Sequence, residues 1–306
     1  MPFTFANINS RASLVQDGHV YDLEAISKGD ILADPLEAIA HIKRIDELAG
    51  ELASFKPSQS VDEVEFLAPI PNPRQSYGVG LNYRNHAEEG GMAIPEVPLV
   101  FTKFPSCVAG PTSLVEMRSD YVDYEGELVV VVGREGADIG VGDAWDFVAG
   151  LCVGQDFSDR AVQLGGDNPQ FSLGKSFATF GPIGPYIVSP DSLGDPTSLR
   201  LTTKVNGEVR QDDDTGDLIF DIPALLSYLS HITPLFPGDL IFTGTPGGVG
   251  VASMNFLTDG DVVETSIEGL GTMQNRCVRV SNHPNADKVP GFIQKGLARK
   301  KEAARD

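Results

Sequence analysis

The pattern of hydrophobic and polar positions divides the chain into two parts with different predicted elements. In the first part, RASLVQDGHVYDL places Asp17-Gly18 between two apolar segments, which predicts a hairpin because Asp-Gly suits a two-residue turn. Asp34-Pro35 combines an N-cap residue with a proline at the first helical position, so a helix is expected to begin there. We therefore expect a small N-terminal α/β module over residues 1–68.

From about residue 75 onward, short apolar segments such as ELVVVVG, GPYIV and DLIFTG are separated by Gly, Pro and Asp. The segment VNGEV carries Asn206-Gly207, which is a strong signal for a two-residue hairpin. Helices are expected at only two places in this part, after Asp143 and from Asp221. This pattern favours an α+β, β-rich fold over regular alternating βαβ units.

Composition and charge exclude several classes of function. None of the apolar runs in the 306 residues approaches the ~18 residues that a membrane span needs. The net charge of −20 repels phosphate backbones, so nucleic-acid binding is not expected. Three cysteines without metal-ligand spacing, and an N-terminus without a secretory pattern, favour a cytoplasmic protein. The basic segment KGLARKKEAAR near the C-terminus is expected to form a short solvated helix or tail.

The stretch DYEGELVVVVG places two glutamates, Glu125 and Glu127, directly before the most apolar run of the chain. Side chains at i and i+2 of a strand point the same way, so the two carboxylates should lie side by side. Burying both is costly unless a cation compensates them or one keeps its proton. The alternative is a strand that leaves the core just before Leu128, with both glutamates in water. Asp156 follows another apolar strand, and three carboxylates without a His or Cys pattern favour Mg²⁺ or Mn²⁺.

The stretch GVGLNYRNHAEEGG contains a candidate proton-transfer pair. Asn82 is expected to cap a helical turn that places His86 and Glu89 at i and i+3 on one face. A carboxylate beside an imidazole raises its basicity and suits it to draw a proton from water. A surface ion pair is the alternative. The flanking glycines fit a segment that closes over a site as a lid.

Two further stretches carry candidate substrate-binding groups. Lys175 lies among apolar residues in GKSFATFGP, and a buried lysine needs an anionic partner, which a carboxylated substrate would provide. The alternative is a lysine whose amine reaches the surface. FTGTPGGVG places Thr243, Gly244 and Thr245 at a strand-to-loop junction, where hydroxyl and backbone N–H groups can bind a carboxylate. An ordinary turn is the alternative for this loop.

Together these stretches resemble a known family. In order, the matching segments are GLNYRNHAEE, DYEGELVVVVG, QDFSDRAVQ, GKSFATFGPIGP, VNGEVRQ and PGDLIFTGTPGGVG. They are similar to the fumarylacetoacetate hydrolase family over roughly residues 75–280. The resemblance implies a mixed β-roll core in a catalytic domain over 69–282, followed by a C-terminal extension over 283–306. It also implies a Mg²⁺ or Mn²⁺ ion, usually a homodimer, and substrates that are 2-oxo or 2,4-dioxo carboxylic acids.

The resemblance also implies roles for individual residues. The metal ligands would be Glu125, Glu127 and Asp156. The catalytic residues would be His86 and Glu89, which activate water, and Lys175. The substrate-binding residues would be Arg160, Gln163, Gly244 and Thr245.

The chain departs from the family pattern at two places. The family usually reads SARD where this chain has SDRA, so Asp159 and Ala161 look exchanged around Arg160. Asp159 is then expected to serve as the carboxylate partner that holds the Arg160 guanidinium. The family also commonly has Asp where Ala178 stands in KSFATF. Both departures are expected to alter the substrate pocket without removing a metal ligand.

The function expected from this reasoning is hydrolysis of a C–C bond in a 2,4-dioxo acid of the acylpyruvate or fumarylpyruvate type. Water activated by His86 would attack, and the metal and Lys175 would stabilise the resulting enolate. An oxaloacetate decarboxylase or a 2-hydroxyhepta-2,4-diene-1,7-dioate isomerase on the same site is the alternative, because all three reactions share this enolate. A non-catalytic, metal-dependent dicarboxylate binder is disfavoured, because binding alone needs no water-activating base such as His86.

Overall fold

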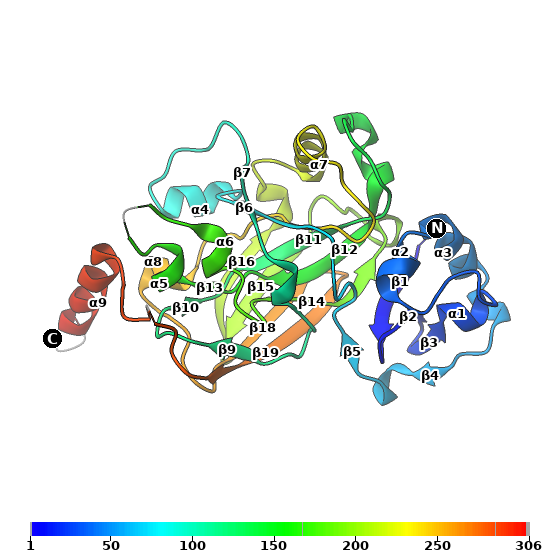
Figure 1. The fold of residues 1–306 in the computed structure, drawn as a ribbon, viewed down its shortest axis with the longest axis horizontal. Coiled ribbons are helices and arrows are strands. Elements are labelled where there is room, and N and C mark those ends of the chain that lie inside the picture. The colour runs from blue at the N-terminus through cyan, green and yellow to red at the C-terminus, as the bar shows by residue number, and fades with distance from the viewer. Residues whose placement is uncertain (1, 167, 285, 304–306) are drawn as a thin grey trace.

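The fold is an α+β fold dominated by sheets (Figure 1). The computed structural model describes residues 2–166, 168–284 and 286–303. Within these ranges, the largest sheet has the strand order β4-β3-β2-β1-β14-β12-β11-β17-β6-β7, with β5 added at β1 and β8 at β14. A second sheet has the order β16-β15-β18-β19-β9, and β10 pairs with β13. The α+β, β-rich expectation is confirmed.

The strands of the described residues have the following bounds: β1 Thr4–Ile8, β2 Arg11–Gln16, β3 His19–Asp22, β4 Gln59–Ser60, β5 Phe66–Leu67, β6 Ser76–Gly80, β7 Leu99–Thr102, β8 Val108–Ala109, β9 Val115–Met117, β10 Val122–Asp123, β11 Gly126–Val132, β12 Val148–Gln155, β13 Ser158–Asp159, β14 Gly181–Val188, β15 Arg200–Val205, β16 Glu208–Asp214, β17 Leu240–Phe242, β18 Val262–Ile267 and β19 Gly271–Arg279. The α-helices are α1 Leu23–Ile26, α2 Pro35–Ile39, α3 Ile42–Gly50, α4 Arg84–Glu89, α5 Arg160–Gln163, α6 Phe171–Gly174, α7 Ile222–Ser230, α8 Gly250–Ser253 and α9 Gly291–Ala303.

The N-terminal segment folds as its local sequence predicts. Asp17 and Gly18 both have positive φ and connect β2 to β3, which confirms the hairpin. The Asp34 side chain accepts hydrogen bonds from two backbone N–H groups of α2, which confirms the predicted helix start. In Figure 1 the segment (blue) lies at one end of the molecule, and its strand β1 pairs with β14 of the main body. A domain boundary at residues 68 and 69 stays a proposal.

The apolar run after Glu127 forms the centre of the molecule. Every residue of β11 and of its antiparallel partner β12 is buried. Val129 and Val131 pack into one hydrophobic cluster, whereas Leu128 and Val130 pack into another. A strand buried on both faces reads as a continuous apolar run, which explains LVVVV.

The remaining local predictions have mixed outcomes. Asn206 and Gly207 join β15 to β16 with positive φ at both positions, as expected for the Asn-Gly hairpin. Asp221 caps α7 by accepting a hydrogen bond from the Ala224 N–H, which confirms that helix. The segment around Asp143 forms a 3₁₀ helix instead of an α-helix, so this prediction is only partly correct. Among the described helices, none has the length and apolar character needed to cross a membrane.

The C-terminal segment is more than a solvated tail. Its helix α9 (red in Figure 1) buries the side chain of Ile293 against Ala161 and Val289. The other faces of α9 are largely exposed. The expectation of a solvated element is therefore wrong for the apolar side of this helix, which docks α9 beside α5.

Candidate metal centre and active site

The candidate metal centre forms where β11 and β12 meet at one end of the sheet. The two strands are antiparallel, with Gly126 opposite Gln155 and Glu127 opposite Gly154. One step further, the Asp156 N–H donates to the Glu125 carbonyl oxygen over 2.8 Å. This hydrogen bond extends the pairing of β11 and β12 by one residue. Glu125 and Asp156 therefore lie at neighbouring strand ends, beside Glu127.

The glycine between the two glutamates is required by close packing. A Cβ atom added to Gly126 would lie 2.2 Å from the Thr203 hydroxyl oxygen, which is well inside van der Waals contact. The Gly126 N–H also donates to the Gln211 side chain over 2.9 Å. The absence of a side chain thus allows the second sheet to approach this backbone and fix both flanking glutamates.

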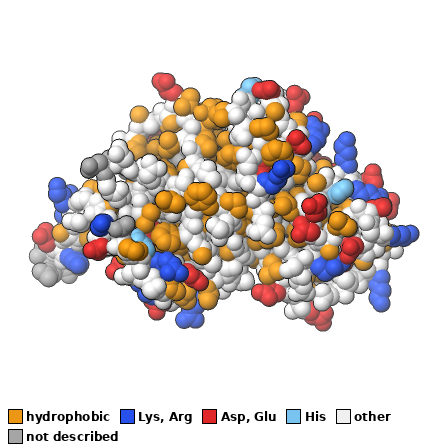
Figure 2. Space-filling view, viewed as in Figure 1, with side chains coloured by type: hydrophobic (Ala, Val, Ile, Leu, Met, Phe, Trp, Pro, Cys, Tyr) orange, Lys and Arg blue, Asp and Glu red, His pale blue; other side chains and the backbone are white. Residues whose placement is uncertain are grey.

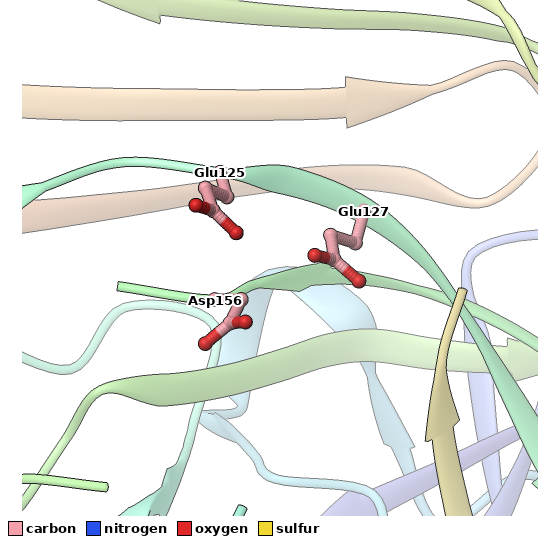
Figure 3. A group of neighbouring side chains, drawn as sticks. All are labelled: Glu125, Glu127 and Asp156. Carbon is pink, nitrogen blue, oxygen red and sulfur yellow. The ribbon is translucent and has the colours of Figure 1, made fainter. Parts of the chain in front are cut away.

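The three carboxylates converge, as the sequence predicts. Glu125, Glu127 and Asp156 offer oxygen atoms that all lie within 4.8 Å of one another, and the side chains point toward a common space (Figure 3). All three are buried, with exposed fractions of 8%, 1% and 0%. The alternative of two solvated glutamates is therefore wrong. Three carboxylates of this kind suit a hard divalent cation.

Two cations close the site from the other side. Lys175 Nζ contacts Glu125 Oε2 and Asp156 Oδ2, each at 2.7 Å. Arg160 Nη2 contacts Glu125 Oε1 at 2.6 Å and Asp123 Oδ2 at 2.7 Å. Lys175 is buried as expected, but its anionic partners in the protein are these carboxylates. The expectation that a substrate must supply its partner is corrected accordingly.

The two glutamates sit in opposite electrostatic environments. Burial alone would raise the pKa of Glu125, but the charges of Lys175 and Arg160 overcome it and lower the pKa to about 2. Burial raises the pKa of Glu127 well above its usual range, and the charges of Asp156 and Glu125 raise it further. Among the described residues, the hydrogen-bond donor to the Glu127 carboxylate is the Gly244 N–H, over 2.8 Å. This uncompensated carboxylate is what a divalent cation would neutralise, so the donor set fits a metal.

Lys103 is a site residue that sequence reasoning missed. Its side chain is fully buried, and Nζ contacts Asp156 Oδ1 at 2.6 Å and the Phe180 carbonyl oxygen at 3.2 Å. Burial lowers the pKa of Lys103, but the Asp156 charge outweighs it and the pKa is raised. The sequence signal for Lys103 was its place directly after the apolar strand LVFT. A lysine buried at such a position requires an anionic partner.

The predicted pair His86 and Glu89 lies on α4 as expected, at i and i+3. Their closest atoms, Nδ1 and Oε2, are 3.7 Å apart, which is an ion-pair distance and longer than a hydrogen bond. Glu89 accepts instead from the Gly248 N–H over 3.1 Å. This contact ties α4 to the glycine-rich loop that follows β17.

The residues before α4 differ from the prediction. Tyr83, and not Asn82, occupies the N-cap position of this helix, and its side chain makes no capping hydrogen bond. Asn82 is fully buried and binds the backbone of Phe220 and Thr243, over 2.7 to 3.0 Å. The predicted cap is wrong because these two long-range partners hold the Asn82 amide. The Tyr83 hydroxyl is buried without a hydrogen-bond partner among the described residues.

The glycine-rich loop supplies backbone and hydroxyl groups to the metal centre. Gly244 has φ of 103°, and its N–H faces Glu127. Thr245 Oγ1 donates to the Gly126 carbonyl oxygen over 2.9 Å and accepts from Gln211 over 2.7 Å. Gln163 accepts a hydrogen bond of 2.6 Å from Arg160 Nη1. The loop and α5 therefore converge on the carboxylates.

The exchange of Asp159 and Ala161 has a different structural role from the one expected. Asp159 does not contact Arg160 through its carboxylate; it caps α5 by accepting from the Ala161 and Val162 N–H groups. Its other oxygen lies 3.3 Å from His283 Nε2. Asp123 and Glu125 hold Arg160 instead, so the predicted pairing is wrong.

The second departure from the family pattern lies away from the pocket. Ala178 is exposed and does not line the pocket above the metal centre. The expectation that this position alters the substrate pocket is therefore not supported by its location.

A pocket of about 360 Å³ opens above the three carboxylates. Glu125, Arg160, Gln163, Lys175 and Thr245 form its polar base, with His86 and Glu89 at its side. Glu127 and Asp156 lie behind this base. The volume is within the range of roughly 300–1,000 Å³ of ordinary ligand sites. The structure thus brings six of the seven predicted catalytic and substrate-binding residues to one cavity, together with the predicted metal ligand Glu125; Gly244 does not line it.

Residues 75–278 match the family model described as fumarylacetoacetate (FAA) hydrolase C-terminal. The chain belongs to this family. Among curated relatives, it is 42% identical over 231 residues to the mitochondrial oxaloacetate tautomerase FAHD2A of Bos taurus, covering 74% of each chain. It is 40% identical over 266 residues to the oxaloacetate tautomerase YisK of Bacillus subtilis, covering 83% of this chain and 85% of that protein.

Solved structures of the fumarylacetoacetate hydrolase family have the same fold. An HpcE-like protein from Mycobacterium smegmatis is 42% identical with a TM-score of 0.85, over 91% of this chain and 100% of that one. A maleylpyruvate hydrolase from Sphingobium, in complex with manganese and pyruvate, is 27% identical with a TM-score of 0.75, over 90% and 99% of the two chains. Members of this family thus include tautomerases and hydrolases of organic acids.

Proposed function

We propose that this protein is a divalent-metal-dependent tautomerase of 2-oxo acids, which moves a proton between the enol and keto forms at C3. The observation that carries the proposal is the buried carboxylate triad beneath a pocket that also contains Lys175 and the His86–Glu89 pair. Curated relatives with 40–42% identity are named as oxaloacetate tautomerases, which supports proton transfer over the hydrolysis expected from sequence.

Glu125, Glu127 and Asp156 are the residues that would hold the cation. When bound, the cation supplies Lewis acidity toward a 2-oxo carboxylate, which makes the C3 proton more acidic. We propose Mn²⁺ as the cation for the first assays, because a related structure contains it.

The surrounding residues bind the acid and move the proton. Arg160, held by Asp123 and Glu125, presents a fixed positive charge to the carboxylate end of the substrate. Lys175 stabilises negative charge that develops on the 2-oxo oxygen as the enolate forms. His86, whose Nδ1 lies 3.7 Å from Glu89 Oε2, delivers a proton to C3 or removes it. The enol hydroxyl loses one proton as C3 gains one, so the reaction is balanced.

C–C bond hydrolysis of a 2,4-dioxo acid is the second candidate. The His86–Glu89 pair favours it, because the same imidazole can activate water when the substrate carries a second carbonyl group. Oxaloacetate decarboxylation and dienedioate isomerisation pass through the same enolate and belong to the same assay panel.

The test follows ketonisation of enol-oxaloacetate and enol-phenylpyruvate by ultraviolet absorbance, with Mn²⁺ and with excess EDTA. We expect rate acceleration only with metal, and a loss of about 100-fold or more in His86→Gln, as is typical for removal of a general acid or base. Acylpyruvates are assayed in parallel by pyruvate release. Acylpyruvate cleavage without any acceleration of ketonisation would reject the tautomerase and favour the hydrolase.

We further propose that the chain forms a homodimer and acts in the cytoplasm. The family resemblance supports the dimer, and three buried free cysteines are consistent with a reducing compartment. Sedimentation velocity tests the dimer directly: a species at twice the 32.7 kDa chain mass supports it, and a concentration-independent monomer contradicts it.

A further inference from the structure

The pocket above the metal centre is chemically divided. Apart from the polar base and the His86–Glu89 pair, every described lining residue is apolar or glycine. The largest of these apolar side chains are Leu81, Met92, Phe101, Leu164, Phe171 and Phe292. They come from separate segments of the chain, including α9, whose Phe292 reaches the pocket from the C-terminal extension.

The apolar wall begins directly beside the charged base. Lys175 Nζ lies 5.2 Å from the centre of the Phe101 ring, and Phe171 meets Phe101 edge-on at 5.6 Å. A Cβ atom on Gly78 would lie 2.3 Å from the Phe101 ring, so this glycine makes room for the ring in its observed position. Figure 2 shows that hydrophobic side chains also gather on the outer face over α4, β7 and α6.

The buried charges favour a single carboxylate on the ligand. Among the described residues, the centre contains four buried carboxylates and three buried cations, namely Asp123, Glu125, Glu127 and Asp156 with Lys103, Arg160 and Lys175. A divalent cation converts the excess negative charge into one excess positive charge. A ligand with one carboxylate neutralises this charge of the seven groups.

Among the described lining residues, a second carboxylate would find no lysine or arginine beyond those of the polar base, and the remaining basic side chain, His86, lies 3.7 Å from Glu89. Arg160 and Lys175 are the only lysine or arginine residues among the described lining residues, and both already contact protein carboxylates. Beyond them, a distal carboxylate would face aromatic rings or Glu89. Removing a charge from water without a partner is costly, so this half of the pocket suits an uncharged group.

We infer that this pocket selects 2-oxo acids with one carboxylate and an apolar tail, and discriminates against acids with a second carboxylate at the far end. The inference rests on the proposed function only because it places the 2-oxo carboxylate end at the metal ligands. The apolar tail then lies against Phe101, Phe171 and Met92.

Two unreactive ligands of matched size test this inference by calorimetry on the Mn²⁺-loaded protein. N-isobutyloxamate and N-oxalylglycine share the same oxalyl end and differ only in an isopropyl group or a carboxylate at the far end. We expect N-isobutyloxamate to bind at least tenfold more tightly. Equal affinity, or tighter binding of N-oxalylglycine, would overturn the inference.

A pair of variants provides the internal control. Met92→Lys places a cation on the pocket wall with an unbranched side chain of similar length, and should improve N-oxalylglycine binding at least tenfold relative to N-isobutyloxamate. Ile94 is two residues away, 55% exposed, and does not line the pocket, so Ile94→Lys should leave the ratio unchanged. An equal shift in both variants would mean that surface charge sets the preference, and would overturn the inference.

The outcomes separate this inference from the proposed function. A preference for N-isobutyloxamate in a protein that accelerates no ketonisation rejects the tautomerase and retains the selectivity. Ketonisation with no preference between the two oxamates rejects the selectivity and retains the tautomerase. Failure of both oxamates to bind in the presence of Mn²⁺ overturns the inference, because the oxalyl end then does not bind at the metal ligands, and ketonisation still decides the tautomerase.

Discussion

Asp156 shows how closely charge is balanced at the scale of single residues. One of its oxygens contacts Lys103 and the other contacts Lys175, at 2.6 and 2.7 Å. Glu125 likewise lies between Lys175 and Arg160. No lysine or arginine of the described residues forms an ion pair with Glu127, and burial raises its pKa, so it is the carboxylate that would gain most from a divalent cation.

Replacement of Glu127 by Gln should therefore abolish tight metal binding. The amide keeps the shape but removes the charge that the cation would neutralise, and we expect Mn²⁺ affinity to fall by more than about 100-fold, beyond the loss from an outer-shell partner. Calorimetry with Mn²⁺ measures this loss. Glu135→Gln, at an exposed position just beyond the other end of β11, serves as the control and should bind Mn²⁺ like the parent protein. Unchanged affinity in Glu127→Gln would contradict the proposed ligand set.

Removal of Lys103 should destabilise the metal-free protein. Lys103→Met leaves the buried Asp156 with one cationic partner instead of two, and breaking a buried ion pair costs about 3–5 kcal/mol. Because Lys175 remains, we expect the free energy of unfolding to fall by about 3 kcal/mol, measured by urea unfolding in the presence of EDTA. Lys56→Met, at an exposed lysine, should change the free energy of unfolding by less than about 0.5 kcal/mol. If the free energy of unfolding falls as little in Lys103→Met as in Lys56→Met, the Lys103–Asp156 ion pair contributes no net stability.

At the scale of elements, short helices carry the groups that surround the metal centre. α4 carries His86 and Glu89, and α5 carries Arg160 and Gln163. Neither helix is long enough to be stable alone, so each depends on specific contacts at its ends. α4 is joined to the glycine-rich loop through Glu89 and Gly248, and α5 begins at the Asp159 cap.

The segment from His86 to Gly91 should become more protected when a ligand binds. Exclusion of bulk water from an enolate favours closure of this segment over the pocket that it lines. Hydrogen exchange of the Mn²⁺-loaded protein, with and without oxalate, measures this change. The amides of α7, which belong to a buried helix away from the pocket, should exchange equally in both states. Equal protection of residues 86–91 in both states would contradict a lid.

The cap of α5 should contribute measurably to stability. Asp159→Ala removes the acceptor for the Ala161 and Val162 N–H groups, so we expect a loss of about 1–2 kcal/mol in the free energy of unfolding. Asp159→Asn keeps a capping oxygen and should lose less. Urea unfolding of both variants decides the matter. Equal losses of stability in Asp159→Ala and Asp159→Asn would show that the contact of Asp159 with His283, and not the cap, accounts for the effect.

At the scale of the whole molecule, two sheets meet at the metal centre. The large sheet supplies Glu125, Glu127 and Asp156, while residues of the second sheet, such as Thr203 and Gln211, pack against Gly126 between the two glutamates. The C-terminal helix α9 completes the pocket with Phe292. Binding at this junction should therefore stabilise the complete fold.

Addition of Mn²⁺ should raise the thermal unfolding temperature of the protein. A ligand that binds only the folded state adds about 2.7 kcal/mol of stability at a concentration 100 times its Kd. Differential scanning calorimetry with increasing Mn²⁺ measures the shift, and EDTA should reverse it. Glu127→Gln should show no shift over the same range. A similar shift in that variant would indicate that Mn²⁺ acts on the acidic surface, whose net charge is −20, and not on the site.

The sequence by itself determined the features that depend on neighbouring residues along the chain. The hairpins at Asp17-Gly18 and Asn206-Gly207 and the helix starts at Asp34 and Asp221 follow from local turn and cap chemistry, and all four are confirmed. The apolar run after Glu127 predicted a buried strand, and long matching segments identified the family.

Only the tertiary structure decided the partners of the buried charges. Lys103 and Asp156 are 53 residues apart, and Arg160 binds Asp123 and Glu125 instead of its neighbour Asp159. Residue spacing cannot predict such pairs, because they form where strands from distant parts of the chain meet. Which of the gathered residues bind substrate stays a prediction. The division has a physical cause: turns and caps are short-range backbone effects, whereas the cost of burying a charge depends on everything that folding brings around it.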